Sequence, residues 1–443
     1  MSLKLFNVVR RTFSTTSSRI PQVCIVGAGP AGFYAAMHIT KNFGAVNVDI
    51  YEKLPVPFGL IRYSFYKDIP TQVKNVINQF TKVAQKPNTY GAEEDKTLGI
   101  ENEDVLNVVA ARNFVGWYNG LPSDKDLKID LSCETAAVLG QGNVALDVAR
   151  ILLSPVDELR KTDITEHALN TLAESKVKEL YLIGRRGPLQ VAFTIKELRE
   201  QLKLKNCRSI WRDSDLEGVS DVVPTLQRPR KRLTELMLKS FNESKEQSSD
   251  GKNLFKPVFF RSPNKFLVDD KRHLTGIELI CNKLVGDKFE EQRCMPTDEK
   301  EIINCGLAFR SIGYKSVKAD EQLVFTNGLV ANDGGSVVDN SKDLAKLYVA
   351  GWLGTGPVGV ILHTMGNAFQ VAKTVCEDLK TMDFTKRRGG FEEVSKVISP
   401  VNSDIINWEH WEKIDKYEIE QGKAKGKPRE KVCDVEKMIE ICK

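Results

Sequence analysis

The sequence has no pair of cysteines in a CxxC spacing, although it contains nine cysteines in all. Their scattered positions argue against a disulfide framework, a zinc site and a redox-active dithiol, and favour a reducing compartment. No apolar run approaches the ~20 residues that a membrane-spanning helix requires. With 41% hydrophobic and 28% charged residues over 443 positions, the chain can fill two or three ordinary domains. Disorder, collagen and coiled coil are therefore excluded.

Acidic residues are missing from the start of the chain, where Asp49 is the first. Residues 1–19 combine four basic side chains with hydroxyls and interleaved apolar residues, which is the composition of a mitochondrial transit peptide. A terminus of chance composition is the alternative, and the short apolar runs disfavour a secretory signal. The whole chain has 64 basic and 59 acidic residues, so the part after residue 19 is near neutral. Overall charge gives no support to a nucleic-acid partner.

A strand, a glycine-rich turn, a helix and a second strand follow one another before Glu52. The predicted strand Val23–Val26 leads into the turn GAGPAG at residues 27–32, and the helix is predicted to end near Asn42. The three small positions permit a tight turn, the approach of a pyrophosphate and close helix–strand packing. The second strand, 46–51, ends at Glu52, where an acid can bind a ribose. We predict a dinucleotide site, against a turn that serves packing alone.

A second copy of this pattern begins at the predicted strand Ala136–Leu139. The turn GQGNVA at residues 140–145 opens a helix that we expect to reach Leu153. The next strand, Glu179–Ile183, ends in GRRG at residues 184–187, with two arginines where an acid would contact a ribose. Arginine forks fit phosphate oxygens, so NADP is favoured over NAD, with a solvated strand end as the alternative. The acid-tipped fold suits FAD, and the pair implies hydride transfer from nicotinamide to flavin.

A third glycine-rich turn, residues 351–361, lies between a predicted strand, 347–350, and a predicted helix, 362–379. Such a turn can point backbone N–H groups at a flavin ring, although Trp352 could be a plain core residue. The fold class is therefore α/β, with two Rossmann-like dinucleotide-binding domains, and the FAD domain is discontinuous. We expect a transit peptide over 1–19, the first FAD part over 20–132, the NADP domain over 133–344, and the second FAD part with a C-terminal tail over 345–443.

The densest positive cluster is RPRKR at residues 228–232. It is either a solvated face or a docking patch for an acidic protein, since complementary charge speeds encounter. Residues 241–256 are predicted to form an exposed loop. The tail that contains Trp408 and Trp411 is polar with scattered aromatic residues, and we expect it to lie over the surface.

Long runs of the sequence resemble mitochondrial ferredoxin–NADP reductases of the adrenodoxin reductase type. The matching runs are VDIYEK, PFGLIR, FVGWYNGLP, LGQGNVALDVARILL, GRRGPLQVAFTIKELRE, RPRKRL, SIGYKS and GKPREK. The resemblance implies a flavoprotein that passes electrons from NADPH through FAD to a 2Fe–2S ferredoxin of the adrenodoxin type. The electrons would serve mitochondrial P450 hydroxylation or iron–sulfur and heme biosynthesis. It also implies a monomer in the mitochondrial matrix, with peripheral association with the inner membrane left open.

Together the motifs and the resemblance assign three binding sites. The FAD site would contain Gly27, Gly29, Ala31, Gly32, Glu52, Leu60, Trp352, Gly359, Val360 and Ile361. The NADP site would contain Gln141, Gly142, Asn143, Val144, Arg185, Arg186 and Glu197, with Gly359 near the nicotinamide. The ferredoxin would dock on Arg199, Arg228, Arg230 and Arg232, and Asp147 would assist proton handling. We find no metal site, and the chemistry requires none because it belongs to the cofactors.

Two departures from the family fall in the FAD domain. After Arg62 the chain reads YSFYKDIP, whereas the family has a Gly-Val-Ala-Pro-Asp-His-Pro loop, so that Ile69 replaces a histidine near the flavin. Further strands and a helix of the family are reduced to Lys86–Thr89. We find no convincing strand from Tyr51 to Ala136, so the FAD domain is predicted to be shortened, with an exposed sheet edge.

The shortened FAD domain leaves open an alternative that is not an enzyme: a non-catalytic splice variant or truncated product that binds NADP without flavin. A flavin monooxygenase would also bind both cofactors, but it would consume oxygen without needing a ferredoxin. A disulfide reductase of similar architecture is disfavoured by the missing CxxC pair.

Overall fold

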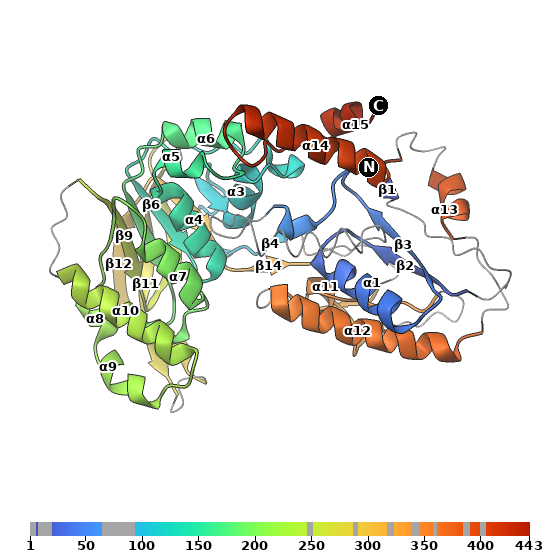
Figure 1. The fold of residues 1–443 in the computed structure, drawn as a ribbon. Coiled ribbons are helices and arrows are strands. Elements are labelled where there is room, and N and C mark those ends of the chain that lie inside the picture. Colours follow the sequence, from blue (N-terminus) through green and yellow to red (C-terminus); the bar gives the residue numbers. More distant parts are fainter. Residues whose placement is uncertain are drawn as a thin grey trace. The chain divides into compact units, whose positions relative to one another are not determined.

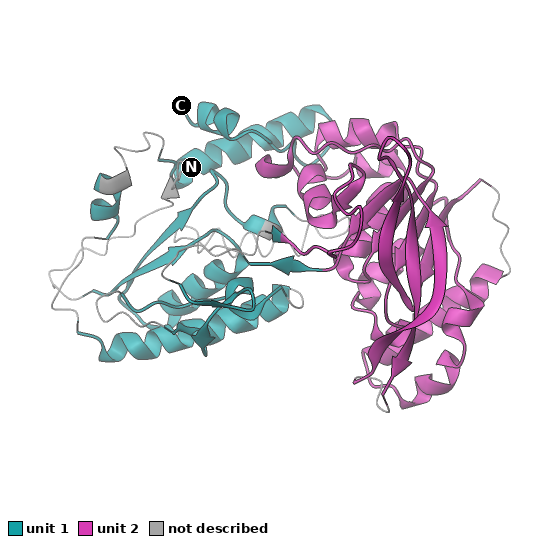
Figure 2. Cartoon of the chain, turned by 180° about the vertical axis from the view of Figure 1, so that it is seen from behind, with its two compact units in different colours: residues 1–94, 313–443 teal, residues 95–312 magenta. Residues whose placement is uncertain are grey.

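The structure is a computed structural model in which the chain forms two compact units (Figure 2). One unit comprises residues 1–94 and 313–443, and the other comprises residues 95–312. The structure describes residues 6–7, 20–63, 94–245, 251–286, 291–316, 323–338, 345–357, 361–383, 390–398 and 405–443. Of the predicted transit peptide, only Phe6–Asn7 belongs to these ranges. Within them, no helix is long and apolar enough to cross a membrane.

The first nucleotide fold of the discontinuous unit forms as the sequence predicts. Strand β2 (Gln22–Val26) runs parallel to β3 (Asn47–Glu52), and helix α1 (Pro30–Asn42) connects them. Proline at the first helical position is favourable because its missing N–H would have no helical partner there. The two-residue strand β1 (Phe6–Asn7) pairs antiparallel with β3, which gives the described sheet the order β1-β3-β2.

The C-terminal segment returns to this fold, which makes the unit discontinuous. Helix α12 (Ile361–Thr381) packs against α1, and the two lie side by side in Figure 1. The strand predicted at 347–350 is wrong, since Tyr348 makes only an isolated bridge to Ser336. The reason is local: strands β17 (Asn332–Asp333) and β18 (Ser336–Val337) form a hairpin, and the backbone at 347–349 hydrogen-bonds to Gly335 in its turn and to Val337 in β18. Among the described residues it does not join the β2–β3 sheet.

The polar tail contains a docked helix, which the sequence analysis did not predict. Helix α14 (Trp408–Ala424) begins with a reciprocal capping box between Asn407 and His410. Trp408 and Trp411 are 5% and 4% exposed, and their rings lie 6.3 and 5.9 Å from the ring of Phe58. Residues three apart share a helix face, so the two tryptophans anchor the tail against the first nucleotide fold.

The other unit contains a six-stranded parallel sheet of order β5-β13-β6-β7-β9-β8. Its strands are β5 (Val108–Ala110), β13 (Leu307–Arg310), β6 (Thr135–Leu139), β7 (Glu179–Ile183), β9 (Asn253–Val258) and β8 (Cys207–Ser209). Helix α4 (Asn143–Leu153) packs against β6, β7 and β9. The α/β fold class with a parallel sheet is confirmed.

Three predictions for this region differ from the structure. Strand β5 lies where we found no convincing strand, because its three buried residues are too few to display a sequence period. The predicted loop 241–256 is wrong, since α10 (Arg230–Lys245) continues into it and β9 begins at Asn253. The unit begins at Asp95 and ends at Ile312, compared with the expected 133–344, because β5 joins β13 and α3 (Ala111–Tyr118) packs on α4.

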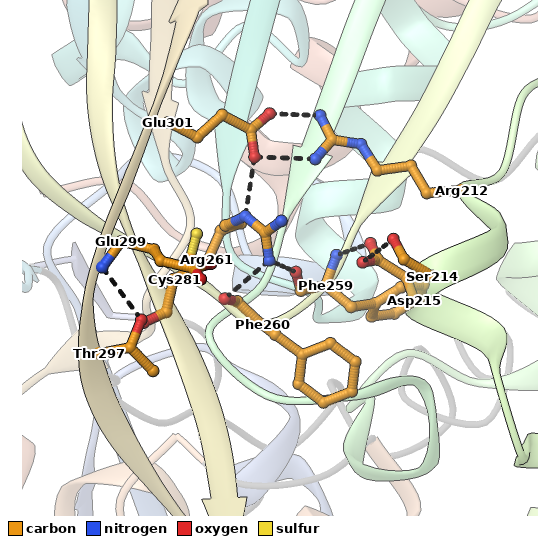
Figure 3. A network of polar contacts seen from close by, with 10 residues as sticks. All are labelled: Arg212, Ser214, Asp215, Phe259, Phe260, Arg261, Cys281, Thr297, Glu299 and Glu301. Carbon is orange, nitrogen blue, oxygen red and sulfur yellow. Dashed lines mark hydrogen bonds and ion pairs between the residues drawn. The ribbon is translucent and has the colours of Figure 1, made fainter.

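An antiparallel sheet of β10 (Arg261–Val268), β11 (Leu274–Val285) and β12 (Arg293–Asn304) completes this unit. Figure 3 shows how it is tied to the end of β9. Glu301 on β12 accepts hydrogen bonds from Arg212 at 2.6 and 2.9 Å and from Arg261 at 2.8 Å. The backbone N–H of Phe259 donates to the carboxylate of Asp215 at 2.8 Å.

The remaining described elements are short. The unit of residues 95–312 also contains α5 (Val156–Leu159), α6 (Glu166–Ala173), α7 (Ile195–Leu202), α8 (Asp213–Leu216), α9 (Val219–Val222) and the 3-10 turns η2 (Pro122–Asp124), η3 (Pro188–Gln190) and η4 (Val223–Thr225). The discontinuous unit contains η1 (Gly59–Ile61), β14 (Tyr314–Lys315), β15 (Phe325–Thr326), β16 (Leu329–Val330), α11 (Trp352–Thr355), α13 (Phe391–Ile398) and α15 (Val435–Cys442). The boundary between the two units in the sequence falls within the two-residue strand β4 (Glu94–Asp95).

Candidate functional site

Glu52 stands at the first glycine turn, at the end of β3. Its carboxylate accepts hydrogen bonds from the backbone N–H groups of Ala28, of Lys53 at 2.8 Å and of Leu54 at 3.2 Å. Gly27 has a φ of 101°, a left-handed conformation that favours glycine. Hydrogen bonds therefore join the acid at the end of β3 to the first glycine turn.

Two further segments of the same unit approach the start of α1. A Cβ added at Gly59 would lie 3.2 Å from the Cα of Gly29, and a Cβ added at Gly351 would lie 2.8 Å from the Cβ of Ala31. Both glycines have positive φ angles, of 47° and 68°. The third glycine-rich turn is thus placed against the first one. The sequence analysis included Gly351 in the third glycine-rich turn but did not single out Gly59, for which the run PFGLIR was the only available signal.

Trp352 carries a buried polar atom without a partner among the described residues. Its indole N–H has no hydrogen-bond acceptor there, whereas its carbonyl oxygen accepts from the hydroxyl of Ser316 at 3.2 Å. The ring lies 5.8 Å from that of Tyr314. An unpaired buried donor costs about 1–3 kcal/mol, which an acceptor on a bound group would offset. The residues present therefore fit a polar ring ligand such as flavin.

Part of the predicted FAD site lies outside the described residues. Gly359 and Val360 lie outside the described residues, and so does the side chain of Leu60. Ile361 is described as the first residue of α12.

The second glycine turn leaves room for a ligand at Gly142. A Cβ added there would meet nothing within 4 Å, whereas one added at Gly140 would lie 2.1 Å from the carbonyl oxygen of Ser311. Gly142 is the N-cap of α4, followed by Asn143 and Val144 in the first turn. An open backbone at a helix N-terminus is suited to phosphate groups, so the residues present fit a dinucleotide.

The loop that contains the arginine pair is held by its backbone. The carbonyl oxygen of Arg185 accepts from the amide of Asn282 at 3.1 Å and from the thiol of Cys294 at 2.9 Å. The carbonyl oxygen of Arg186 accepts from the N–H of Phe260 at 3.2 Å. Both arginine side chains are exposed. A fixed backbone with exposed guanidinium groups suits the recognition of an anionic ligand.

This loop is also joined to the second glycine turn. The carbonyl oxygen of Gln141 accepts from the N–H groups of Ala192 at 2.9 Å and Phe193 at 3.0 Å. The side-chain oxygen of Asn143 accepts from the N–H of Thr194 at 2.8 Å, just before α7. Hydrogen bonds therefore join the second glycine turn to the segment between the arginine pair and α7.

Asp147 faces α7 from the packed helix α4. Its carboxylate pairs with Arg150 at 2.5 Å, and Arg150 also pairs with Glu200. Burial raises the pKa of Asp147 to about 7; Arg150 opposes this shift, and the nearby carboxylates of Glu197 and Glu200 add to it. Glu197 is half-buried and accepts a hydrogen bond from the hydroxyl of Thr194. The structure thus brings the two predicted acids, Asp147 and Glu197, close together.

The four predicted docking arginines do not share one environment. Arg199 on α7, Arg232 on α10 and Arg228, which lies two residues before α10, are all exposed. Helix α7 packs against α10. Arg230 is half-buried and donates to the carbonyl oxygen of Val191 at 2.9 Å.

Comparison with known proteins finds a family match and close relatives. Residues 25–90 match the NAD(P)-binding Rossmann-like domain. The chain is 44% identical to a protein of Drosophila melanogaster named NADPH:adrenodoxin oxidoreductase, mitochondrial, with 100% of this chain and 99% of that one covered. The proteins of the same name from Homo sapiens and Arabidopsis thaliana are 42% and 39% identical over 96% and 98% of this chain, with 93% and 97% of their own lengths covered.

The chain belongs to the NADPH:adrenodoxin oxidoreductase family.

A solved structure, that of FprA from Mycobacterium tuberculosis in complex with NADPH, is 30% identical and superposes with a TM-score of 0.88. The superposition covers 96% of this chain and 100% of the FprA chain. The alignment with the fruit-fly relative runs over 487 positions, although this chain has 443 residues. That member of the adrenodoxin oxidoreductase family therefore has residues without a counterpart here.

Proposed function

We propose that the protein is an NADPH:ferredoxin oxidoreductase of the adrenodoxin reductase type. FAD, when bound, accepts a hydride from NADPH and releases electrons singly to a 2Fe–2S ferredoxin. The observation that carries the proposal is the contrast between the two glycine turns. One is closed by the carboxylate of Glu52, and the other, open at Gly142, is followed by the exposed arginines 185 and 186. Family membership supports the same assignment.

The described residues would hold each cofactor in a different way. Glu52 and the start of α1 would hold the ribose and pyrophosphate of FAD, and the indole N–H of Trp352 would donate to its ring. The N-terminus of α4 would bind the pyrophosphate of NADP(H), because its N–H groups carry partial positive charge. Arg185 and Arg186 would select the 2′-phosphate. Asp147 would hold a proton near neutral pH.

The proposal extends to the partner and the location, which the surface and the relatives support. Arg199, Arg228 and Arg232 would form a docking patch for an acidic ferredoxin, since charge complementarity steers encounter. The relatives are named mitochondrial, and the basic, acid-free start of the chain supports import into that compartment. We assign the enzyme to the mitochondrial matrix as a monomer.

The visible spectrum of the protein expressed from residue 20 tests the proposal. Flavin absorption bands that bleach on anaerobic addition of NADPH, and reappear on addition of oxidised ferredoxin, are the expected result. A protein that bleaches and then consumes oxygen stoichiometrically without ferredoxin would be a monooxygenase. A folded, colourless protein that still binds NADP would be the non-catalytic product that the shortened FAD domain suggests.

A further inference from the structure

The start of α10 places a third arginine beside the pair that follows β7. Arg230 is the first residue of α10, and α10 packs against η3, which directly follows Arg185 and Arg186 in the chain. The guanidinium of Arg230 donates to the carbonyl oxygen of Val191 at 2.9 Å, within the same loop. Arg230 is thereby fixed to the loop that contains the arginine pair.

Arg230 differs from its neighbours in the basic cluster. Arg228 and Arg232 are exposed, whereas Arg230 is half-buried. In the described part of the chain, neither Arg230 nor Arg186 forms an ion pair with a carboxylate, although many other arginines do. Burial and the charge of Arg186 both lower the pKa of Arg230. Like charges gathered away from acids repel one another, and a bound anion would relieve that repulsion.

We propose that Arg230 belongs to the NADP site, where it contributes a third positive charge to the recognition of the 2′-phosphate. This inference rests on the proposed function, because it deepens the cofactor specificity of the same site. It moves Arg230 away from ferredoxin docking, which Arg199, Arg228 and Arg232 then provide. A phosphate dianion is the ligand that suits three guanidinium groups, since each can donate two hydrogen bonds to its oxygens.

The alternative is that Arg230 only positions the loop through Val191. The two roles differ in their effect on nucleotides that lack the 2′-phosphate. The loop contacts Gln141 and Asn143 at the second glycine turn. If Arg230 only positions this loop, its loss should weaken the binding of every nucleotide at the turn. If Arg230 contacts the 2′-phosphate directly, its loss should weaken the binding only of nucleotides that carry this group.

Isothermal titration of the purified protein with 2′,5′-ADP and with 5′-ADP separates these roles without any activity measurement. We expect the wild type to bind 2′,5′-ADP more tightly. Arg230→Gln should weaken the binding of 2′,5′-ADP by about 10-fold or more and leave the affinity for 5′-ADP unchanged, as expected for the loss of a charge-assisted hydrogen bond. Arg230→Lys, which keeps the charge, should recover part of the loss. Lys239→Gln removes an exposed charge from the same helix and is the matched control.

Each remaining outcome overturns a different statement. If Arg230→Gln preserves the preference for 2′,5′-ADP, or weakens both nucleotides equally, Arg230 is not a 2′-phosphate residue. If the wild type itself shows no preference for 2′,5′-ADP, the proposed NADP specificity fails, and the inference fails with it.

Discussion

Arg62 and Glu418, which stand 356 positions apart, form a buried ion pair with an N–O distance of 2.5 Å. Glu418 on α14 is fully buried and also accepts hydrogen bonds from Arg429 at 3.1 Å and from the N–H of Val432 at 2.8 Å. The guanidinium of Arg62 lies 5.0 Å from the ring centroid of Trp411. The pair therefore fastens the C-terminal tail to the segment that follows η1, close to the first glycine turn.

Substitution Glu418→Gln should lower the free energy of unfolding by about 3–5 kcal/mol, because it leaves Arg62 buried without its counter-charge. Urea unfolding followed by tryptophan fluorescence measures this directly. Glu420→Gln is the control, since Glu420 lies on the same helix with a side chain that is 58% exposed. It should change stability by no more than about 0.5 kcal/mol. Equal stability of the two variants would show that the buried pair contributes little.

Asp147 should give stability a pH dependence of its own. Its pKa is raised from 3.8 in the unfolded chain to about 7 in the folded protein. At pH values in the window between these two pKa values, the folded state keeps a proton that the unfolded chain has lost. The contribution of Asp147 to the free energy of unfolding therefore falls as pH rises through the window, by up to about 1.4 kcal/mol per pH unit. Asp147→Asn should remove this slope, and Arg150 keeps Glu200 as its partner in the variant. A constant difference between the two proteins across the window would contradict the expectation.

The docking patch can be tested at one arginine on each of two packed helices. Arg199→Gln and Arg232→Gln should each raise the KM for an acidic ferredoxin several-fold at low salt, and the effect should shrink as salt screens the charges. Reduction of ferricyanide, a small acceptor, should keep its rate. Lys239→Gln serves again as the exposed control on α10. An unchanged KM for ferredoxin in both arginine variants would move the docking surface elsewhere.

Sequence patterns predicted the parts of the fold that local chemistry determines. The strand–turn–helix around residues 22–52 formed within a residue or two of its predicted bounds, because glycine and proline each act on near neighbours. The burial of Glu418 could not be predicted, since its partner Arg62 is distant in the chain. The separate environment of Arg230 was equally hidden, because RPRKR is a uniform run in sequence and only the packing of α10 against η3 distinguishes its members.

Substitution by alanine should affect the stability of the protein differently at the two glycines of the second turn. Gly142 has a φ of −100° and open space where a Cβ would stand, so Gly142→Ala should leave the free energy of unfolding almost unchanged. Gly140 has a φ of 134°, and its added Cβ would lie 2.1 Å from a backbone oxygen, so Gly140→Ala should destabilise the protein. The space at Gly142 is instead where we expect the pyrophosphate to approach.

Gly142→Ala should therefore weaken NADP(H) binding by about 10-fold or more while thermal unfolding of the protein without nucleotide stays at the wild-type temperature. Titration calorimetry and a thermal melt, run on the same preparation, measure the two quantities independently. A variant that binds NADP(H) like the wild type would mean that the nucleotide does not lie over the start of α4. A variant that loses stability and binding together would mean that Gly142 serves the turn itself, as Gly140 does, and that its open side is not a ligand cradle.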